Sequence, residues 1–344
     1  MKKVGMVLCG GLGKRLRPIT DRVPKSLVEI RKGFTILDKQ LLDLKYSGVD
    51  EVILLTGYMH EKIEERYGSS WNGLEILYSV EEEPLGTWGA IAKALREYRP
   101  KARLVIMNGD VITDINLRNM VDNASYPVTM LVVSMRSPYG IVDINGGVIV
   151  KFVEKPVLPY YINAGIYVVR EDFDILDFVG TVSKLPSDIE VDVFPKLAKA
   201  GLLGSYMEPD SDVFWKSIDT VKDLEEVRRE FANRVEKPWG YEKVIASADS
   251  YVYKKILVKE GYRVPLHYHR VREETIHVIK GRVEVHSTDG VLAVLRRDSA
   301  YTVKPGTPHR LVAQENTVLH EISTPNVDDT VVLEAYETGG VIDV

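Results

Sequence analysis

Short apolar runs alternate with amphipathic segments along the first two thirds of the chain. Runs rich in Val, Ile, Leu and Met predict strands over residues 4–9, 51–56, 74–80 and 103–108. Between them, apolar residues recur at helical spacing over 35–48 and 87–98. In the first of these segments Leu37, Leu41 and Leu44 share one face, and Gly48 follows as a stop signal. This alternation predicts a parallel sheet with helices on both faces, a doubly wound α/β layer.

The pattern changes after residues 220–234, which predict a last helix. From Lys237 onward, short strands separated by turns are predicted over 251–259, 275–286, 292–297, 309–314 and 317–323. Such a series is typical of an all-β barrel or jelly roll. The 344 residues also exceed one ordinary core. We therefore expect an α/β domain over 1–233 and an all-β domain over 236–344.

Composition narrows the classes of partner and compartment. The formal net charge of −5 gives no support to nucleic-acid binding. No window approaches the roughly 20 continuous apolar residues of a membrane span, and the apolar run near the N-terminus is interpreted as a strand, not a signal peptide. Cys9 is the one cysteine, so an intrachain disulfide is impossible. We expect a cytoplasmic protein that binds neither nucleic acid nor membrane.

The first predicted strand ends in a glycine-rich loop, GGLGKRLRPIT, at residues 10–20. The loop lacks the Walker A pattern, and the dinucleotide pattern fails at Leu16, where a third glycine belongs. A plain glycine turn that leads into a helix is one interpretation. In the other, backbone N–H groups of the turn hold phosphate oxygens and the helix adds its dipole. Arg15 and Lys25 then supply positive charge for the outer phosphates of a triphosphate.

The string from this loop through Pro24 and Lys25 resembles the signature of sugar-1-phosphate nucleotidyltransferases. The segments PLGTWGA, IMNGD, SPYGIVDI, FVEKP and NAGIYVV continue the resemblance across the first domain. It implies a Rossmann-like, GT-A-type fold and a reaction of an NTP with a sugar 1-phosphate. The catalytic residues that it implies are Arg15, Lys25, Asp110 and Lys155. The nucleotide-binding residues that it implies are Gly10, Gly11, Gly13, Gly86 and Thr87. The sugar-binding residues that it implies are Gly140, Glu154, Asn163 and Gly165.

The same resemblance implies a Mg²⁺ site. The family places a magnesium-binding aspartate at the position of Asp110. Many members close the site with a second aspartate where this chain has Ser217. Because some relatives carry that aspartate two residues later, we assign the second ligand to Asp219. The acidic run Glu81–Glu83 is interpreted as a solvated strand end.

The second domain contains a histidine cluster within GYRVPLHYHRVREETIHVIKG, residues 261–281. His267 and His269 are two residues apart on a predicted strand, so their side chains face one side. Glu274 follows on the next strand, His309 comes in a later turn, and together they make a divalent transition-metal site. The spacing resembles the cupin metal motif, which implies a jelly roll that holds Zn, Mn, Fe, Co or Ni. Over residues 237–340 the chain is similar to type II mannose-6-phosphate isomerases.

The two resemblances together predict a sugar-activating enzyme. The first domain is similar to mannose-1-phosphate guanylyltransferases, which implies that it makes GDP-mannose. The cupin would interconvert mannose 6-phosphate and fructose 6-phosphate, and we expect a homo-oligomer, a dimer. Guanylyl transfer to heptose 1-phosphate and cytidylyl, uridylyl or thymidylyl transfer to glucose 1-phosphate stay open. So does a sensor of sugar nucleotides without turnover, with a structural cupin.

Overall fold

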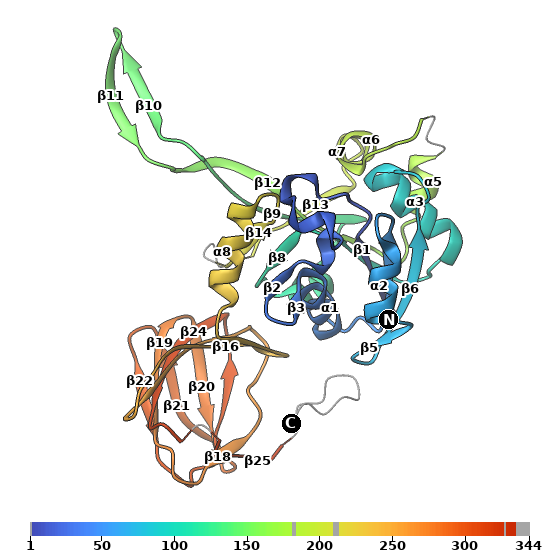
Figure 1. Cartoon of the computed structure of the whole chain (residues 1–344). Coiled ribbons are helices and arrows are strands. Elements are labelled where there is room, and N and C mark those ends of the chain that lie inside the picture. Colours follow the sequence, from blue (N-terminus) through green and yellow to red (C-terminus); the bar gives the residue numbers. More distant parts are fainter. Residues whose placement is uncertain (1, 181–183, 209–212, 327, 335–344) are drawn as a thin grey trace. The chain divides into compact units, whose positions relative to one another are not determined.

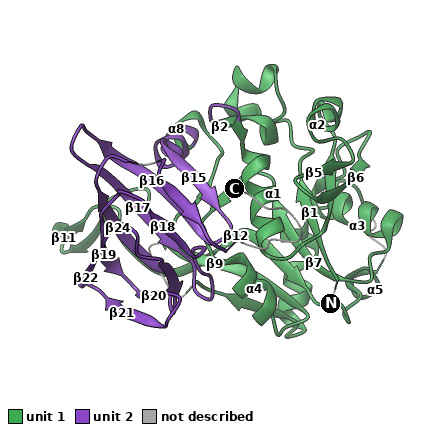
Figure 2. Cartoon of the chain, turned by 90° about the horizontal axis from the view of Figure 1, so that it is seen from below, with its two compact units in different colours: residues 1–29, 34–223 green, residues 30–33, 224–344 purple. Residues whose placement is uncertain are grey.

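The computed structural model describes residues 2–180, 184–208, 213–326 and 328–334. Val327 and residues 335–340, which belong to the cupin resemblance, lie outside these ranges. The chain divides into two compact units, residues 1–29 with 34–223 and residues 30–33 with 224–344 (Figure 2). The domain boundary at 233–236 stays a prediction. It follows helix α8 (Val221–Phe231) and overlaps strand β15 (Arg234–Lys237).

The first unit is built on an eight-stranded sheet (Figure 1). Its parallel centre consists of the four predicted strands, in the order β7 (Arg103–Asn108), β1 (Lys3–Leu8), β4 (Glu51–Thr56) and β6 (Leu74–Val80). The flanking strands are β5 (Ser70–Trp71) beside β6 and, beyond β7, β12 (Val157–Val169), β9 (Val128–Arg136) and β13 (Leu203–Tyr206). Because β12 is antiparallel to both neighbours, the complete sheet is mixed around a parallel centre.

Helices cover both faces of this sheet, because successive residues of each strand point to opposite faces. One core packs Leu37 and Leu41 of α1 (Ile36–Tyr46) with Val52. The other packs Ile91 of α3 (Gly86–Tyr98) with Ile53. The remaining helices of the unit are α2 (His60–Tyr67), α4 (Leu117–Asn123), α5 (Ile175–Val179), α6 (Ile189–Asp192) and α7 (Phe194–Lys199). The doubly wound layer and its two predicted helices are confirmed.

The second unit begins with most of helix α8, and beyond that helix it is all-β, as predicted, with antiparallel strand pairs. A six-stranded sheet has the order β15, β16 (Gly240–Ser247), β17 (Val252–Val258), β24 (Thr317–Ser323), β19 (Glu274–Lys280) and β22 (Ala300–Val303). A three-stranded sheet has the order β21 (Val291–Arg296), β20 (Arg282–His286) and β23 (Arg310–Ala313). β18 (His267–His269) pairs with β25 (Thr330–Val332). The predicted run 275–286 is divided at Gly281, whose φ of +86° turns the chain between β19 and β20.

Two antiparallel pairs of the first unit stand apart from its large sheet. β8 (Val111–Thr113) pairs with β14 (Trp215–Ser217). β10 (Ile141–Asn145) pairs with β11 (Val148–Val153) to form a hairpin, which we call the arm (Figure 1). Among the described residues, no helix is long and apolar enough to cross a membrane.

Candidate active site and candidate metal centre

A cavity of about 370 Å³ lies at the carboxyl ends of the parallel strands, where open α/β sheets hold their ligands. Leu8 ends β1, Leu55 is the penultimate residue of β4 and Asn108 ends β7, and all three line the cavity. It is also lined by nine residues that the sequence singled out: Gly10, Gly11, Gly13, Arg15, Lys25, Gly86, Thr87, Asp110 and Asp219. The structure therefore brings the glycine loop, the cations and both aspartates together.

Glycine is required at two positions of the loop after β1. Gly13 adopts a φ of +59°, and a Cβ atom there would lie 2.8 Å from a methyl carbon of Thr20. A Cβ atom at Gly10 would lie 2.1 Å from Glu81 Oε1. A larger residue at either position would strain the backbone or displace its neighbour.

The α-helix expected after this loop is absent from the structure. The chain instead makes a three-residue 3₁₀ turn over Lys14–Leu16. Pro18 lies two residues after this turn, and proline cannot donate the backbone hydrogen bond that a helix interior needs. Phosphate binding at this loop would therefore rest on backbone N–H groups and cationic side chains, without a helix dipole.

Lys25 lies between the two aspartates of the cavity. Its Nζ is 2.7 Å from Asp110 Oδ2 and 3.4 Å from Asp219 Oδ1. Arg15 Nη2 lies 2.7 Å from the same Asp219 oxygen. The Lys25 side chain is 16% exposed and that of Arg15 is 69% exposed. Because carboxylate oxygens are the protein ligands that Mg²⁺ prefers, this pair of aspartates fits a magnesium ion.

The pairing of β8 with β14 explains why Asp219 reaches Asp110. Val111 is the register partner of Ser217, and the Ile218 N–H donates to the Asp110 carbonyl oxygen at 2.9 Å. Asp219 is the next residue and lines the cavity, whereas Ser217 is not among the lining residues of the described chain. The geometry favours the later aspartate as the second ligand, and its metal-binding role stays a prediction.

None of the five residues expected to contact the sugar or its phosphate is among the residues that line the cavity. Gly140 directly precedes β10, and Glu154 and Lys155 directly follow β11, so all three lie at the base of the arm. Glu154 and Lys155 are both more than half exposed and form an ion pair with each other, Nζ to Oε1, at 3.6 Å. Their contacts with a sugar phosphate stay predictions.

Asn163 and Gly165 lie closer to the cavity. A Cβ atom at Gly165 would lie 3.0 Å from Asn108 Nδ2, and Asn108 is a lining residue. Asn163 Oδ1 accepts a hydrogen bond from the Gly165 N–H at 2.9 Å, and this bond fixes the backbone where the register of β12 is irregular. Both residues stay predicted sugar contacts.

Glu81 is a cavity residue that the sequence interpretation assigned to a solvated strand end. It lines the cavity with Gly86 and Thr87, and its Oε2 accepts from the Leu85 N–H at 3.0 Å. The other two acids of the run are exposed. The signal that was missed is the position of Glu81 directly after the parallel strand β6. Ligands of open α/β sheets bind at the carboxyl ends of the parallel strands.

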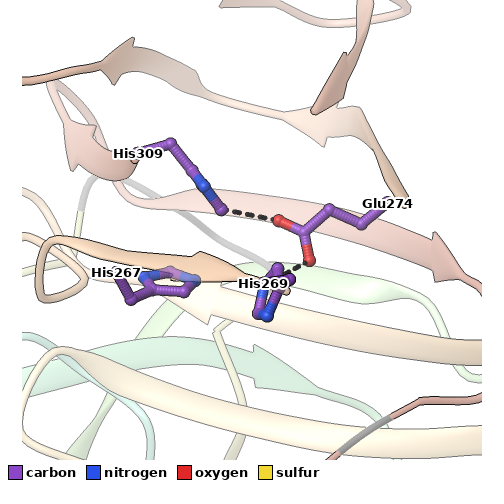
Figure 3. Close-up of side chains that lie close together, drawn as sticks. All are labelled: His267, His269, Glu274 and His309. Carbon is purple, nitrogen blue, oxygen red and sulfur yellow. Dashed lines mark hydrogen bonds and ion pairs between the residues drawn. The ribbon is translucent and has the colours of Figure 1, made fainter. Parts of the chain in front are cut away.

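Four side chains converge in the second unit (Figure 3). Ligand atoms of His267, His269, Glu274 and His309 all lie within 4.8 Å of one another. β18 supplies the first two residues, β19 supplies Glu274, and His309 directly precedes β23. The set chosen from sequence spacing is therefore brought together.

Hydrogen bonds turn two of these histidines toward the cluster. His267 Nδ1 lies 2.8 Å from the Pro265 carbonyl oxygen, and His309 Nδ1 lies 3.0 Å from the Thr307 carbonyl oxygen. Because a carbonyl oxygen only accepts, each Nδ1 donates to its carbonyl, and Nε2 is the ring nitrogen that each histidine has left for the cluster. Such outer hydrogen bonds orient histidine ligands around metals.

The contacts inside the cluster fit a cation. His309 Nε2 lies 2.7 Å from Glu274 Oε1, and His269 Nε2 lies 3.1 Å from Oε2. Burial alone would raise the pKa of Glu274, but the adjacent imidazoles of His269 and His309 bring it well below its usual range. Burial and the charge of His309 lower the pKa of His267 to about 4. His267 is therefore neutral at pH 7, the form that binds metals.

Two polar residues beside the cluster were not singled out by the sequence. Arg272 Nη2 lies 2.5 Å from His269 Nε2 and 3.2 Å from Glu274 Oε2, so a bound metal would compete with Arg272 for these atoms. Burial, and then the negative charge of Glu274, raise the pKa of Glu321 to about 7. Lys254 Nζ lies 3.4 Å from Glu321 Oε1. Buried residues alternate with less buried ones along β24, and Glu321 is at a buried position. Because successive strand residues point to opposite faces, this alternation could have placed Glu321 inside from the sequence.

Two family models match the chain. The one described as "Nucleotidyl transferase" matches residues 4–234, and the one described as "Cupin domain" matches residues 255–324. A D-glycero-alpha-D-manno-heptose 1-phosphate guanylyltransferase of Aneurinibacillus thermoaerophilus is 38% identical over 176 residues, which cover 48% of this chain and 74% of that protein.

Further similarity appears among fungal proteins and solved structures. A mannose-1-phosphate guanyltransferase of Yarrowia lipolytica is 34% identical over 239 residues, which cover 64% of this chain and 61% of that protein. The chain thus spans about three fifths of that relative's length. The crystal structure of HddC from Yersinia pseudotuberculosis matches with a TM-score of 0.52 and 24% identity, over 67% of this chain and 100% of that one. This last likeness shows the fold.

Proposed function

The chain belongs to the nucleotidyl transferase family, and from that membership we propose that it is a sugar-1-phosphate nucleotidyltransferase. In the proposed reaction an NTP and a sugar 1-phosphate give an NDP-sugar and pyrophosphate. The observation that carries the proposal is the convergence of Lys25, Arg15 and two aspartates on the cavity beside the glycine loop.

The proposed transfer needs no general base. An oxygen of the sugar phosphate attacks the α-phosphorus of the NTP, and the bond from that phosphorus to the pyrophosphate oxygen breaks. The attacking phosphate is already anionic at neutral pH, so catalysis rests on positioning and charge neutralisation. Backbone N–H groups of Gly10, Gly11 and Gly13 hold triphosphate oxygens, and Arg15 and Lys25 stabilise the departing pyrophosphate.

Asp110 and Asp219 would hold Mg²⁺ in this proposal. When bound, Mg²⁺ supplies positive charge at the α-phosphate and the incoming sugar phosphate. Lys25 exchanges its carboxylate partners for phosphate oxygens when the nucleotide binds. The position of Lys25 in the cavity lining supports this exchange, because its ammonium is open to a ligand there.

The sugar side of the site is proposed from the predicted contacts. Lys155 holds the attacking phosphate, and the sugar is contacted by Gly140, Glu154, Asn163 and Gly165. The closeness of Gly165 to Asn108, which lines the cavity, supports a sugar site beside the cavity.

We assign GTP as the nucleotide and mannose 1-phosphate as the acceptor, which makes GDP-mannose the product. Relatives that are named guanylyltransferases support this choice. Glu81 supports it independently, because a carboxylate only accepts hydrogen bonds and guanine presents the adjacent donors N1–H and N2–H₂. Uracil and thymine flank their single N3–H with carbonyl oxygens, which a carboxylate repels. Gly86 and Thr87 line the cavity together with Glu81.

For the cupin we propose a divalent transition metal, one of Zn, Mn, Fe, Co or Ni, held by His267, His269, Glu274 and His309. The inward Nε2 atoms of His267 and His309 support this site. We further propose that this unit interconverts mannose 6-phosphate and fructose 6-phosphate. When bound, the metal polarises carbonyl and hydroxyl oxygens of such a substrate.

The proposal keeps the predicted organisation of the chain. A transferase domain over 1–233 and a cupin domain over 236–344 would work in the cytoplasm. Cys9 as the one cysteine agrees with a reducing compartment.

Pyrophosphate release by the purified chain with Mg²⁺ tests the transferase. GTP, ATP, CTP, UTP and dTTP are each combined with mannose, glucose and heptose 1-phosphates. We expect one strong pair, GTP with mannose 1-phosphate. A different strong pair would keep the transferase and overturn the specificity. If no combination releases pyrophosphate and the chain binds finished NDP-sugars, the result would favour the sensor of sugar nucleotides.

The isomerase is tested separately. The chain is supplied with Mn²⁺, Zn²⁺ or Co²⁺ and with fructose 6-phosphate, and mannose 6-phosphate is measured. No conversion with a metal-loaded cupin would leave the cupin as a binding or structural unit.

A further inference from the structure

Asp110 lies in a two-residue turn, and a buried glutamine bonds the backbone on both sides of that turn. Gly109 and Asp110 connect the end of β7, Asn108, to the start of β8, Val111. Gln40 of α1 is fully buried beside them. Its Nε2 donates to the Asn108 carbonyl oxygen at 2.8 Å and to the Val111 carbonyl oxygen at 3.0 Å. The two amide protons thus join α1 to both ends of the turn.

Two further contacts fix the same turn. A Cβ atom at Gly109 would lie 2.0 Å from the Leu8 carbonyl oxygen, so the turn lies directly against the end of β1. The Ile218 N–H donates to the Asp110 carbonyl oxygen at 2.9 Å. Backbone contacts thus hold the turn from β1 and from the residue after β14, and the Gln40 side chain holds it from α1.

The Gln40 amide has one atom that packing does not explain. Within the part of the chain that the structure describes, its Oε1 is buried and accepts no hydrogen bond. Buried polar atoms without a partner are rare in native proteins, and departures from such rules are concentrated at functional sites. Gln40 thus keeps an unbonded oxygen while both of its amide protons are used at the turn that carries Asp110.

We propose that Gln40 is a positioning residue of the transferase, whose amide holds the Asp110 turn where the Asp110 carboxylate meets the cavity. This role rests on the proposed transfer, in which Asp110 holds Mg²⁺. Because Asp110 belongs to a turn and not to a strand, its position depends on contacts of this kind. Asp110 Oδ2 also lies 2.7 Å from Lys25 Nζ, so a displaced turn would disturb a phosphate-binding cation as well.

Gln40→Met tests this role, because it removes both donors and keeps a side chain of similar length. We expect the Mg²⁺ concentration that gives half-maximal pyrophosphate release to rise about 10–100-fold, the usual effect of losing an outer partner of a metal site. At saturating Mg²⁺ the KM for GTP should be unchanged, because the glycine loop is not altered. Gln40→Glu, which has the same shape and at most one donor, should shift the Mg²⁺ dependence in the same direction. It replaces the methionine variant if that variant does not fold.

Thr35→Ala is the matched control, because it weakens the same helix without touching the turn. Thr35 Oγ1 accepts from the Asp38 N–H at 3.1 Å and caps the N-terminus of α1. Thr35→Ala should lower the unfolding temperature and leave the Mg²⁺ dependence as in wild type. An equal Mg²⁺ shift in this variant would overturn the proposal, since any loss of α1 stability would then have the same effect.

Hydrogen exchange provides a readout that needs neither Mg²⁺ nor turnover. In the full chain without added Mg²⁺, backbone N–H groups of residues 108–111 should exchange faster in Gln40→Met than in wild type, and Thr35→Ala should match wild type there. Unchanged exchange in Gln40→Met, or faster exchange with a wild-type Mg²⁺ dependence, would overturn the proposal. If the wild-type chain releases no pyrophosphate, the proposed transfer fails, whereas exchange still decides whether Gln40 holds the turn.

Discussion

Lys25 Nζ lies 2.7 Å from Asp110 Oδ2, although 85 positions separate the two residues in the chain. The contact follows from the sheet, because β1 and β7 are parallel neighbours and both strands end at the same edge. It pairs a cation proposed for phosphate with a carboxylate proposed for Mg²⁺. The proposed transfer depends on this pair.

Replacing Asp110 by asparagine should lower the rate of pyrophosphate release by at least about 10²–10³-fold, the usual cost of removing one electrostatic group from a site of this kind. Circular dichroism should be unchanged, because Asp110 lies at the cavity and not in a core. The exposed Asp122, which pairs with Lys3, provides the control Asp122→Asn. Near-wild-type release by the Asp110 variant would rule out the metal assignment.

The substitution Glu81→Gln should reduce kcat/KM for GTP by about 10–100-fold, because charged hydrogen bonds are worth about 1.5–3 kcal/mol. The loss for other nucleotides should be smaller, since their bases do not offer two adjacent donors. Steady-state kinetics with all five NTPs measures the change. Glu83→Gln is the matched control on the exposed part of the same run. An unchanged order of NTP preference would remove Glu81 from base recognition.

The cupin cluster should bind about one divalent ion per chain, measured by elemental analysis after dialysis. His309→Ala should lose at least about nine tenths of that metal, since changes even to outer partners cost 10–100-fold in affinity. His286→Ala serves as the control, because His286 pairs with Glu284 on another part of the unit. Chelation of the wild-type metal should also lower the unfolding temperature. Equal metal content in both variants would contradict the ligand set.

Asp223 should make stability depend on acid pH. Burial alone would raise its pKa, but hydrogen bonds from Lys216 and Thr220 outweigh burial and lower the pKa from 3.8 to about 2. Because the folded pKa lies below the ordinary value, the ionised group stabilises the fold above pH 3.8, and this contribution is lost as the pH falls toward 2.

Asp223→Asn should therefore lower the free energy of unfolding at pH 7 by on the order of 2 kcal/mol. Urea unfolding at pH 7, 5 and 3 should show the difference from wild type narrowing at the lowest pH. Asp249→Asn, at an exposed position, should have little effect. A difference that is the same at all three pH values would contradict the assignment.

The sequence was most informative where a motif and a strand end coincide. The runs at 4–9 and 103–108 predicted β1 and β7, so Arg15, Lys25 and Asp110 could be placed at one edge of a sheet. Asp219 could be assigned only through the family resemblance. The pairing of β8 with β14, which brings Asp219 to the cavity, is a ladder of three residue pairs about 100 positions apart in the chain. Glu81 was missed because three consecutive acidic residues predict a solvent-exposed segment. That pattern does not show which of the three side chains faces a cavity.

The arm shows a limit of hydrophobic patterning. Its sequence, IVDINGGVIVKFV, contains the Asn-Gly signal of a hairpin, but apolar strand residues usually predict burial. Whether a strand packs on the sheet or leaves it depends on tertiary contacts that local spacing does not encode. For the same reason, spacing could not show that Lys155 lies outside the cavity.

Tracing the α-phosphorus of GTP tests the central claim most directly. The chain is incubated with Mg²⁺, mannose 1-phosphate and GTP labelled with ³²P at the α-position, and the products are separated. We predict that the label appears in GDP-mannose while the released pyrophosphate is unlabelled. Label that stays in GTP, or appears in GMP or GDP without a sugar conjugate, would contradict the transfer.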